Sequence, residues 1–174
     1  MNRGDLEGLR VAVLTVSDRV AAGTRGDAGG SALCDLLEGA GATLVSRAVV
    51  ADEREPITDT LRALTADADV VLTTGGTGLG PRDITPEATR AVLDREAPGI
   101  AEALRHASLA ITPFAMLSRA TAGLAGRVLV VNLPGNPKAV REEWSVLAPV
   151  LAHAVETARG PVPDERHHHP GRGR

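Results

Sequence analysis

Apolar residues in this chain gather in short runs that polar residues seldom interrupt. Residues 70–72 (Val-Val-Leu) are the clearest example, and residues 9–16 and 127–132 have the same character. A run without alternation is typical of a strand in a parallel sheet, where helices cover both faces. We therefore expect buried strands at these three places, a further strand at residues 43–50, and a short one near residues 114–118.

Between these runs, apolar residues recur with helical spacing. From Leu33 to Ala40, leucine or alanine stands at positions i, i+3, i+4 and i+7, which places them on one helix face. Similar spacing predicts helices from Pro56 to about Asp67, at residues 85–95 and 99–110, and over a long segment that ends before residue 160. Because strands and helices alternate, the sequence predicts an α/β fold with a mostly parallel, doubly wound sheet.

The length and the apolar content limit the number of domains. With 174 residues, 43% of them hydrophobic, the chain suffices for one domain with a full core but not for two. We assign residues 1–8 to an N-terminal lead and residues 9–160 to the domain. Residues 161–174 contain Pro, Gly, Arg and His without periodicity, which predicts a disordered tail.

The apolar run at residues 70–72 leads into a loop that is rich in glycine, with Gly75, Gly76, Gly78 and Gly80. Thr85 is a suitable N-cap for the helix that follows, and Pro86 suits its first position. A loop with so few side chains can turn several N–H groups toward one anion. The spacing matches neither a Walker loop nor the dinucleotide-binding motif. The sequence thus predicts a phosphate site of another kind.

Polar residues follow directly after the expected strands, where ligands bind in open parallel sheets. The residues delivered there are Ser17, Asp18, Asp52, Asp83, Asn132, Pro134, Gly135, Asn136 and, slightly further along, Lys138. Carboxylates repel phosphate unless a cation lies between them, so the pattern implies Mg²⁺, which Asp52 and Asp83 would hold directly or through water. Structural interpretations exist as well, because aspartates form turns at strand ends and Asp83 can support a helix N-terminus.

The charge and the aromatic content argue against nucleic acid as a partner. The net charge is −3 and only 1% of the residues are aromatic, so the chain has neither a basic field nor a stacking platform for bases. Cys34 is the single cysteine, which excludes an internal disulfide. No apolar run is long enough to cross a membrane and no signal peptide is recognised, so we expect a cytoplasmic protein.

Four motifs together resemble a known family. They are Thr-Thr-Gly-Gly-Thr-Gly at 73–78, Asp-Ile-Thr-Pro-Glu-Ala-Thr at 83–89, Leu-Ser-Arg at 117–119, and Asn-Leu-Pro-Gly-Asn-Pro-Lys at 132–138. The chain resembles the MogA/MoaB family of molybdenum cofactor biosynthesis proteins, which is related to the gephyrin G domain. The likeness extends over residues 10–160.

The resemblance implies a three-layer α/β/α domain that forms a homotrimer. It also implies a molybdopterin adenylyltransferase, which transfers AMP from Mg-ATP to the terminal phosphate of molybdopterin and releases pyrophosphate. Two acids that the family uses in catalysis match Asp52 and Asp83, although Ala51 stands where the family has proline. The residues that would border pterin or nucleotide are Ser17, Asp18, Thr74, Gly75, Gly76, Thr77, Gly78, Ser118, Asn132, Pro134, Gly135, Asn136 and Lys138.

Two other functions stay open at this point. Some MoaB-type members resemble the enzymes without clear activity, so the chain can be a molybdopterin-binding protein that does not turn over. Molybdate-insertion enzymes contain a related fold. The chain can therefore act in molybdate insertion itself, or it can bind such an enzyme as a partner. Against molybdate insertion, we expect this chain to lack the additional domains of those enzymes.

Overall fold

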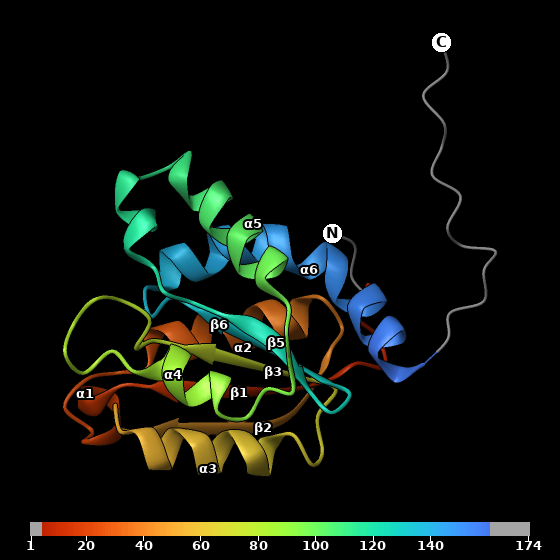
Figure 1. The fold of residues 1–174 in the computed structure, drawn as a ribbon, viewed down its shortest axis with the longest axis horizontal. Coiled ribbons are helices and arrows are strands. Elements are labelled where there is room, and N and C mark those ends of the chain that lie inside the picture. Colours follow the sequence, from red (N-terminus) through yellow and green to blue (C-terminus); the bar gives the residue numbers. More distant parts are fainter. Residues whose placement is uncertain (1–4, 161–174) are drawn as a thin grey trace.

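Six strands form one mixed, mostly parallel sheet at the centre of the molecule (Figure 1). The computed structural model describes residues 5–160. Along the sheet the strand order is β2-β1-β3-β6-β5-β4. The strands are β1 (Arg10–Val16), β2 (Thr43–Val50), β3 (Val70–Thr74), β4 (Arg95–Glu96), β5 (Ala122–Ala125) and β6 (Val128–Leu133). The first four in this order are parallel, whereas β5 runs antiparallel to both β6 and β4.

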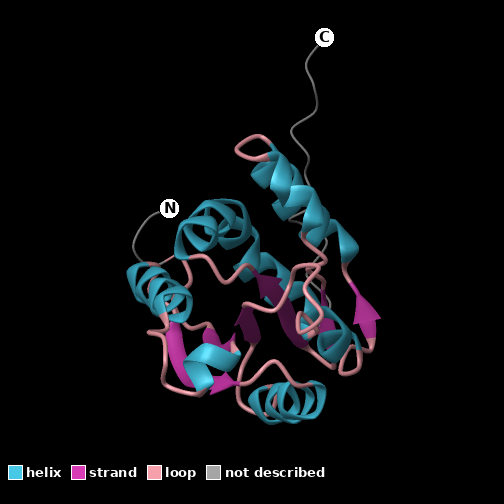
Figure 2. Cartoon of the chain, turned by 90° about the vertical axis from the view of Figure 1, so that its left-hand side faces the viewer, coloured by secondary structure: helices cyan, strands magenta, loops and turns pink. Residues whose placement is uncertain are grey.

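Helices cover both faces of the sheet, so the predicted α/β class is confirmed. They are α1 (Asp18–Ala21), α2 (Ala28–Gly39), α3 (Arg54–Leu64), α4 (Thr85–Arg90), α5 (Pro98–Leu109), α6 (Pro137–Arg159) and the 3-10 helix η1 (Pro113–Leu117). Figures 1 and 2 show α3 and α4 on one face and α2, α5 and α6 on the other. Within residues 5–160, no helix combines the length and the apolar character needed to span a membrane.

The core explains why the strand sequences show no alternation. In β1, Val11 and Val13 are buried against the face covered by α2 and α6, while Ala12 and Leu14 are buried against the face covered by α3. Both sides of a central strand therefore exclude water, and polar side chains would have to be hydrogen-bonded there. All five residues of β3 are buried for the same reason.

Near the sheet edge, the helix expected at 85–95 is wrong in its length. α4 ends at Arg90, and β4 begins at Arg95. β4 pairs with β5, whose sequence Ala-Gly-Leu-Ala has low intrinsic strand propensity and gave no signal. In that pairing the backbone of Arg95 approaches Gly123 so closely that a Cβ there would collide with the Arg95 carbonyl.

The short strand expected near 114–118 is also wrong, because this segment is η1. Pro113 fixes φ and lacks a donor, which suits the start of a helix, and the Thr112 hydroxyl accepts from the Phe114 N–H at 3.4 Å. Phe114, Met116 and Leu117 are exposed rather than buried in a sheet. The apolar composition of this segment alone does not distinguish a short strand from a 3-10 helix.

The described residues, 5–160, include part of the N-terminal lead and none of the predicted tail. The predicted disordered tail, residues 161–174, lies outside the described residues. Leu6, which the sequence analysis placed in the N-terminal lead, is buried in the core and its N–H donates to the carbonyl of Ala40 at 3.1 Å.

A buried carboxyl group lies between α5 and α6. Glu143 is 6% exposed, its Oε1 accepts a hydrogen bond from the Ser108 hydroxyl at 3.3 Å, and its Oε2 has no partner among the described residues. Burial raises the pKa of Glu143 to about 7, and the charge of Glu142 adds to this, against the opposing effects of Ser108 and Arg105. The native state thus favours the protonated carboxyl.

We predict that Glu143→Gln removes a pH-dependent loss of stability. In the wild type the stabilising effect of protonation is complete below about pH 4.5 and is lost as the pH rises toward about 7. The difference in unfolding free energy between variant and wild type should grow across this window to the order of 3 kcal/mol. Urea unfolding at several pH values measures it. Glu102→Gln, an exposed change on α5, is the control, and equal pH profiles for both variants would contradict the prediction.

Candidate functional site

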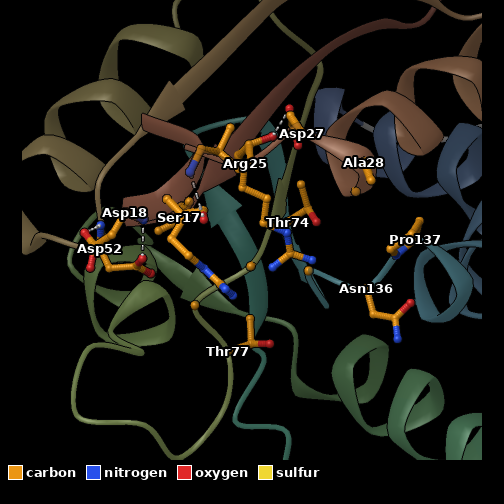
Figure 3. Close-up of a pocket in the computed structure, with 18 of the residues that line it drawn as sticks. Ser17, Asp18, Arg25, Asp27, Ala28, Asp52, Thr74, Thr77, Asn136 and Pro137 are labelled. Carbon is orange, nitrogen blue, oxygen red and sulfur yellow. Dashed lines mark hydrogen bonds between the residues drawn. The ribbon is translucent and has the colours of Figure 1, made fainter. Parts of the chain in front are cut away.

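A cavity of about 670 Å³ opens at the carboxyl ends of β1, β3 and β6. Its wall comes from residues 15–20, 25–29, 74–78 and 135–137, together with Asp52 and Asp83. These segments are far apart in sequence, and the parallel strands bring their ends to one edge of the sheet. Figure 3 shows side chains from several of them facing the same space.

The glycine loop after β3 is held from both sides. Gly75 has φ of 99°, and its N–H donates to the carbonyl of Leu133 at 3.1 Å. Thr85 was expected to cap α4, but the N-cap is Ile84. The Thr85 hydroxyl instead donates to the carbonyl of Gly75 at 2.9 Å, and its N–H donates to the carbonyl of Gly76 at 3.1 Å. Thr85 thus anchors the loop rather than the helix end.

Three backbone segments meet beside this loop without side chains between them. A Cβ on Gly29 would lie 2.7 Å from the Gly135 carbonyl oxygen, and a Cβ on Gly135 would lie 3.2 Å from the Cα of Gly75. The Thr74 hydroxyl donates to the carbonyl of Pro134 at 2.8 Å and joins two of these segments. The glycines therefore permit the close approach that forms the floor of the site.

Asp18 and Asp52 hold each other through their backbones (Figure 3). The N–H of Asp18 donates to Asp52 Oδ2 at 2.7 Å, and the N–H of Asp52 donates to Asp18 Oδ1 at 3.0 Å. Arg82 donates to both oxygens of Asp18, at 3.0 and 2.7 Å. The Arg82 guanidinium lowers the pKa of Asp18, whereas burial, and then the charges of Asp18 and Asp83, raise that of Asp52.

Both predicted catalytic acids lie against the glycine loop. A Cβ on Gly76 would lie 3.0 Å from Asp52 Oδ1, and a Cβ on Gly78 would lie 2.8 Å from Asp83 Oδ2. The same oxygen of Asp83 accepts from the N–H of Gly80 at 2.9 Å. Asp83 makes no cap to α4, since no side chain caps that helix. Its carboxylate lines the cavity instead.

Sequence reasoning missed a further acid at the cavity wall. Asp27 caps α2 by accepting from the Gly30 N–H at 2.9 Å, and it accepts from the Thr15 hydroxyl and from Arg47, each at 2.8 Å. Burial alone would raise the pKa of Asp27, but the hydrogen bonds from Arg47, Gly30 and Thr15 lower it overall. An aspartate directly before a helix was the available signal.

Two arginines at the cavity wall were also missed. Arg19 and Arg25 line the cavity, and neither guanidinium forms an ion pair with another of the described residues. The N–H of Arg25 donates to the carbonyl of Arg19 at 3.1 Å, which joins the loop that carries Arg25 to α1, where Arg19 lies. Their charges are available to an anion.

Most of the predicted site residues lie together at the cavity. The residues in question are Ser17, Asp18, Asp52, Thr74, Gly75, Gly76, Thr77, Gly78, Asp83, Gly135 and Asn136. Asn136 also caps α6, because its side chain accepts from the Lys138 N–H at 2.9 Å.

Four predicted residues do not line the cavity. Asn132 is 1% exposed, and its Nδ2 donates to the hydroxyls of Thr73 and Thr89 at 3.0 and 2.9 Å, so its amide joins β3, β6 and α4 inside the core. Lys138 points along α6, with Nζ 3.8 Å from Glu142. Pro134 contributes only its carbonyl to Thr74, and Ser118 follows η1 outside the cavity.

A family model and two known proteins match this chain over most of its length. A family model described as a probable molybdopterin binding domain matches residues 12–153. The molybdopterin adenylyltransferase of Helicobacter pylori strain J99 is 37% identical over 159 residues, which cover 89% of this chain and 90% of that protein. The molybdopterin adenylyltransferase of Escherichia coli K12 is 42% identical over 139 residues, 77% of this chain and 71% of that protein.

A solved structure is also similar to this chain over most of its length. The molybdopterin biosynthesis enzyme MoaB from Thermus thermophilus aligns with a TM-score of 0.82 at 46% identity, covering 88% of this chain and 98% of that one. The chain belongs to the MogA/MoaB family. It spans only 26% and 22% of two longer relatives, cinnamon of Drosophila melanogaster and gephyrin of Dictyostelium discoideum.

In this MogA/MoaB-family chain we predict that Gly75→Ala destabilises the fold by roughly 3 kcal/mol, because a Cβ at this positive φ is strained and would collide with the carbonyl of Val16. Gly26→Ala is the matched control, since a Cβ there meets nothing within 4 Å, and it should change stability by less than about 0.5 kcal/mol. Denaturant unfolding measures both. Equal stability of the two variants would contradict the tight loop packing.

Proposed function

We propose that this chain is a molybdopterin adenylyltransferase of molybdenum cofactor biosynthesis. The observation that carries the proposal is the contact of two carboxylates, Asp52 and Asp83, with one glycine loop at a single cavity. Phosphate binds to backbone N–H groups in such loops, and carboxylates beside it fit a reaction in which a divalent cation accompanies the nucleotide. The adenylyltransferase relatives at about 40% identity support the same activity.

The carboxylate oxygens of Asp52 and Asp83 suit an Mg²⁺ ion that arrives with ATP better than a metal ion that the protein holds by itself. Among the described residues, no group of three or more His, Cys, Asp or Glu side chains could hold a metal by itself. Asp52 Oδ1 and Asp83 Oδ1 accept no hydrogen bond within residues 5–160, so each can offer a hard oxygen. Substrate phosphates and water would complete the shell, and bound Mg²⁺ would neutralise phosphate charge.

The charges at the cavity are divided between two roles. Arg82 and Arg47 neutralise Asp18 and Asp27, which leaves Asp52 and Asp83 for the cation and Arg19 and Arg25 for phosphate. In the transfer, a terminal phosphate oxygen of molybdopterin attacks the α-phosphorus of ATP, and the bond to pyrophosphate breaks. The protein supplies position and charge, and no covalent intermediate with a side chain is required.

Incubation of the purified protein with molybdopterin and Mg-ATP tests the proposal. Adenylylated molybdopterin and pyrophosphate should form in equal amounts, as measured by chromatography and a pyrophosphate assay. If molybdopterin binds and no product forms, the chain is instead a binding protein without turnover. The match to a family model described as a probable molybdopterin binding domain supports this second function as the alternative.

We predict that Asp83→Asn lowers kcat by at least about 100-fold, because it removes a negative charge from the site of transfer. The free energy of unfolding should change by no more than about 1 kcal/mol, since the side chain lies outside the core. Asp59→Asn on α3, outside the cavity lining, should leave kcat unchanged. Loss of the fold in Asp83→Asn would instead favour a structural role for this acid.

We also predict that Arg25→Gln raises the KM for one phosphate-bearing substrate about tenfold, the effect of one charge-assisted hydrogen bond. Separate titrations of Mg-ATP and molybdopterin show which substrate is affected. Arg62→Gln on α3 removes an exposed arginine elsewhere and serves as the control. Unchanged KM values for both substrates would contradict the prediction and show that Arg25 is a solvated surface charge.

The assembly and the location implied by the resemblance stay predictions. A homotrimer is measured by light scattering coupled to gel filtration. Association with a molybdate-insertion enzyme, which would take up adenylylated molybdopterin, and a cytoplasmic location are proposed on the same basis.

A further inference from the structure

Arg119 contacts the active-site loop through both its backbone and its side chain. Its N–H donates to the carbonyl of Thr77 at 2.9 Å, and its Nε donates to the carbonyl of Gly78 at 2.7 Å. Its Nη2 donates to the carbonyl of Asp83, and its Nη1 pairs with Glu87. One guanidinium thus joins both ends of the segment 78–83 to the first turn of α4.

The positive charge of Arg119 is balanced away from the substrate. Arg119 does not line the cavity, and its guanidinium is paired with Glu87 Oε1. Burial tends to raise the pKa of Glu87, but the hydrogen bond from Arg119 lowers it overall, so Glu87 is ionised at neutral pH. Because the pair is nearly neutral, Arg119 acts on the site through the backbone it holds.

The segment that Arg119 holds has few other restraints. Between Gly78 and Asp83 the side chains are largely exposed, with Leu79 at 65% exposure. Asp83 is joined to the segment by its own N–H, which donates to the carbonyl of Gly80 at 3.0 Å, and by its Oδ2, which accepts from the Gly80 N–H. These two bonds lie within the segment and do not fix it relative to the cavity. Its other link to the cavity is the exposed ion pair of Arg82 with Asp18.

The other side of the contact is firm. Arg105 on α5 donates to the carbonyls of Ser118 and Ala120, at 3.4 and 2.8 Å, on either side of Arg119. Ala120 is buried. The segment that carries Arg119 is therefore fixed to α5.

We propose that Arg119 is a positioning residue that holds the carboxylate of Asp83 at the cavity by fixing the backbone at Gly78 and Asp83. The proposal rests on the adenylyl transfer proposed above, in which Asp83 acts on the substrate. This positioning role needs a planar group with several donors in fixed directions. Lysine has a single ammonium group and cannot reach the same acceptors together. Loss of the clamp should misplace Asp83, and a displacement of about 1 Å can cost about 100-fold in rate.

Kinetics of Arg119→Gln and Arg119→Lys test the role in catalysis. We expect kcat to fall about 100-fold in the first and about tenfold in the second, while the KM for molybdopterin changes less than twofold. Arg90→Gln is the control, because Arg90 lies on α4 and, within residues 5–160, forms its ion pair with Glu96. Equal loss in the control, or an unchanged kcat in Arg119→Gln, would overturn the proposal.

A double-mutant cycle separates positioning from a general structural effect. If Arg119 acts through Asp83, the variant that combines Arg119→Gln with Asp83→Asn should be no slower than Asp83→Asn alone. Multiplication of the two losses would show that Arg119 acts independently of Asp83 and would overturn the proposal.

Hydrogen exchange tests the clamp without any turnover. Amides of residues 78–84 should exchange at least tenfold faster in Arg119→Gln than in the wild type or in Arg90→Gln, while core amides of β3 are unchanged. If the wild type transfers no adenylyl group, the proposed function fails and this measurement still decides whether Arg119 orders the loop. Unchanged exchange in residues 78–84 would overturn the clamp itself.

Discussion

The site depends on the close approach of three backbones at the ends of parallel strands. Gly29, Gly75 and Gly135 come from three different segments, and each leaves room where a Cβ would touch its neighbour. Parallel β1, β3 and β6 bring the segments to one edge, and the glycines let them meet there. The N–H groups of the loop and the carboxylates around it are consequently presented to one space.

Electrostatics then divides the polar residues between structure and function. Asp18 and Asp27 are fixed by Arg82 and Arg47, and they support a loop and a helix cap. Asp52 is half-buried beside other acids, and partial burial, followed by the charges of Asp18 and Asp83, raises its pKa, so it favours a nearby cation. The cavity lining thus combines two acids that are paired with arginines, Asp18 and Asp27, with two acids that form no ion pair among the described residues, Asp52 and Asp83.

A second layer of contacts lies behind the residues that face the cavity. Asn132 is one of its members, since its amide joins threonines of β3 and α4 within the core. Thr85 and Arg119 are others, and each fixes a carbonyl of the glycine loop. Thr85 and Arg119 satisfy carbonyl groups that the irregular loop leaves without strand partners, whereas Asn132 joins side chains within the core.

The sequence by itself determined the class of the fold and named most of the candidate residues that line the cavity. Unbroken apolar runs predicted the buried strands, because a strand covered on both faces needs no polar alternation, and strand ends located Asp52, Asp83 and the glycine loop. It did not predict β5, whose Ala-Gly-Leu-Ala sequence becomes a strand only through pairing with β6. Nor did it separate Asn132 from Asn136, since only the direction of each side chain relative to the sheet decides which one faces the cavity. The tertiary structure made that choice, and it paired Arg47, Arg82 and Arg119 with their acids, because both outcomes depend on distances between segments that local patterns do not encode.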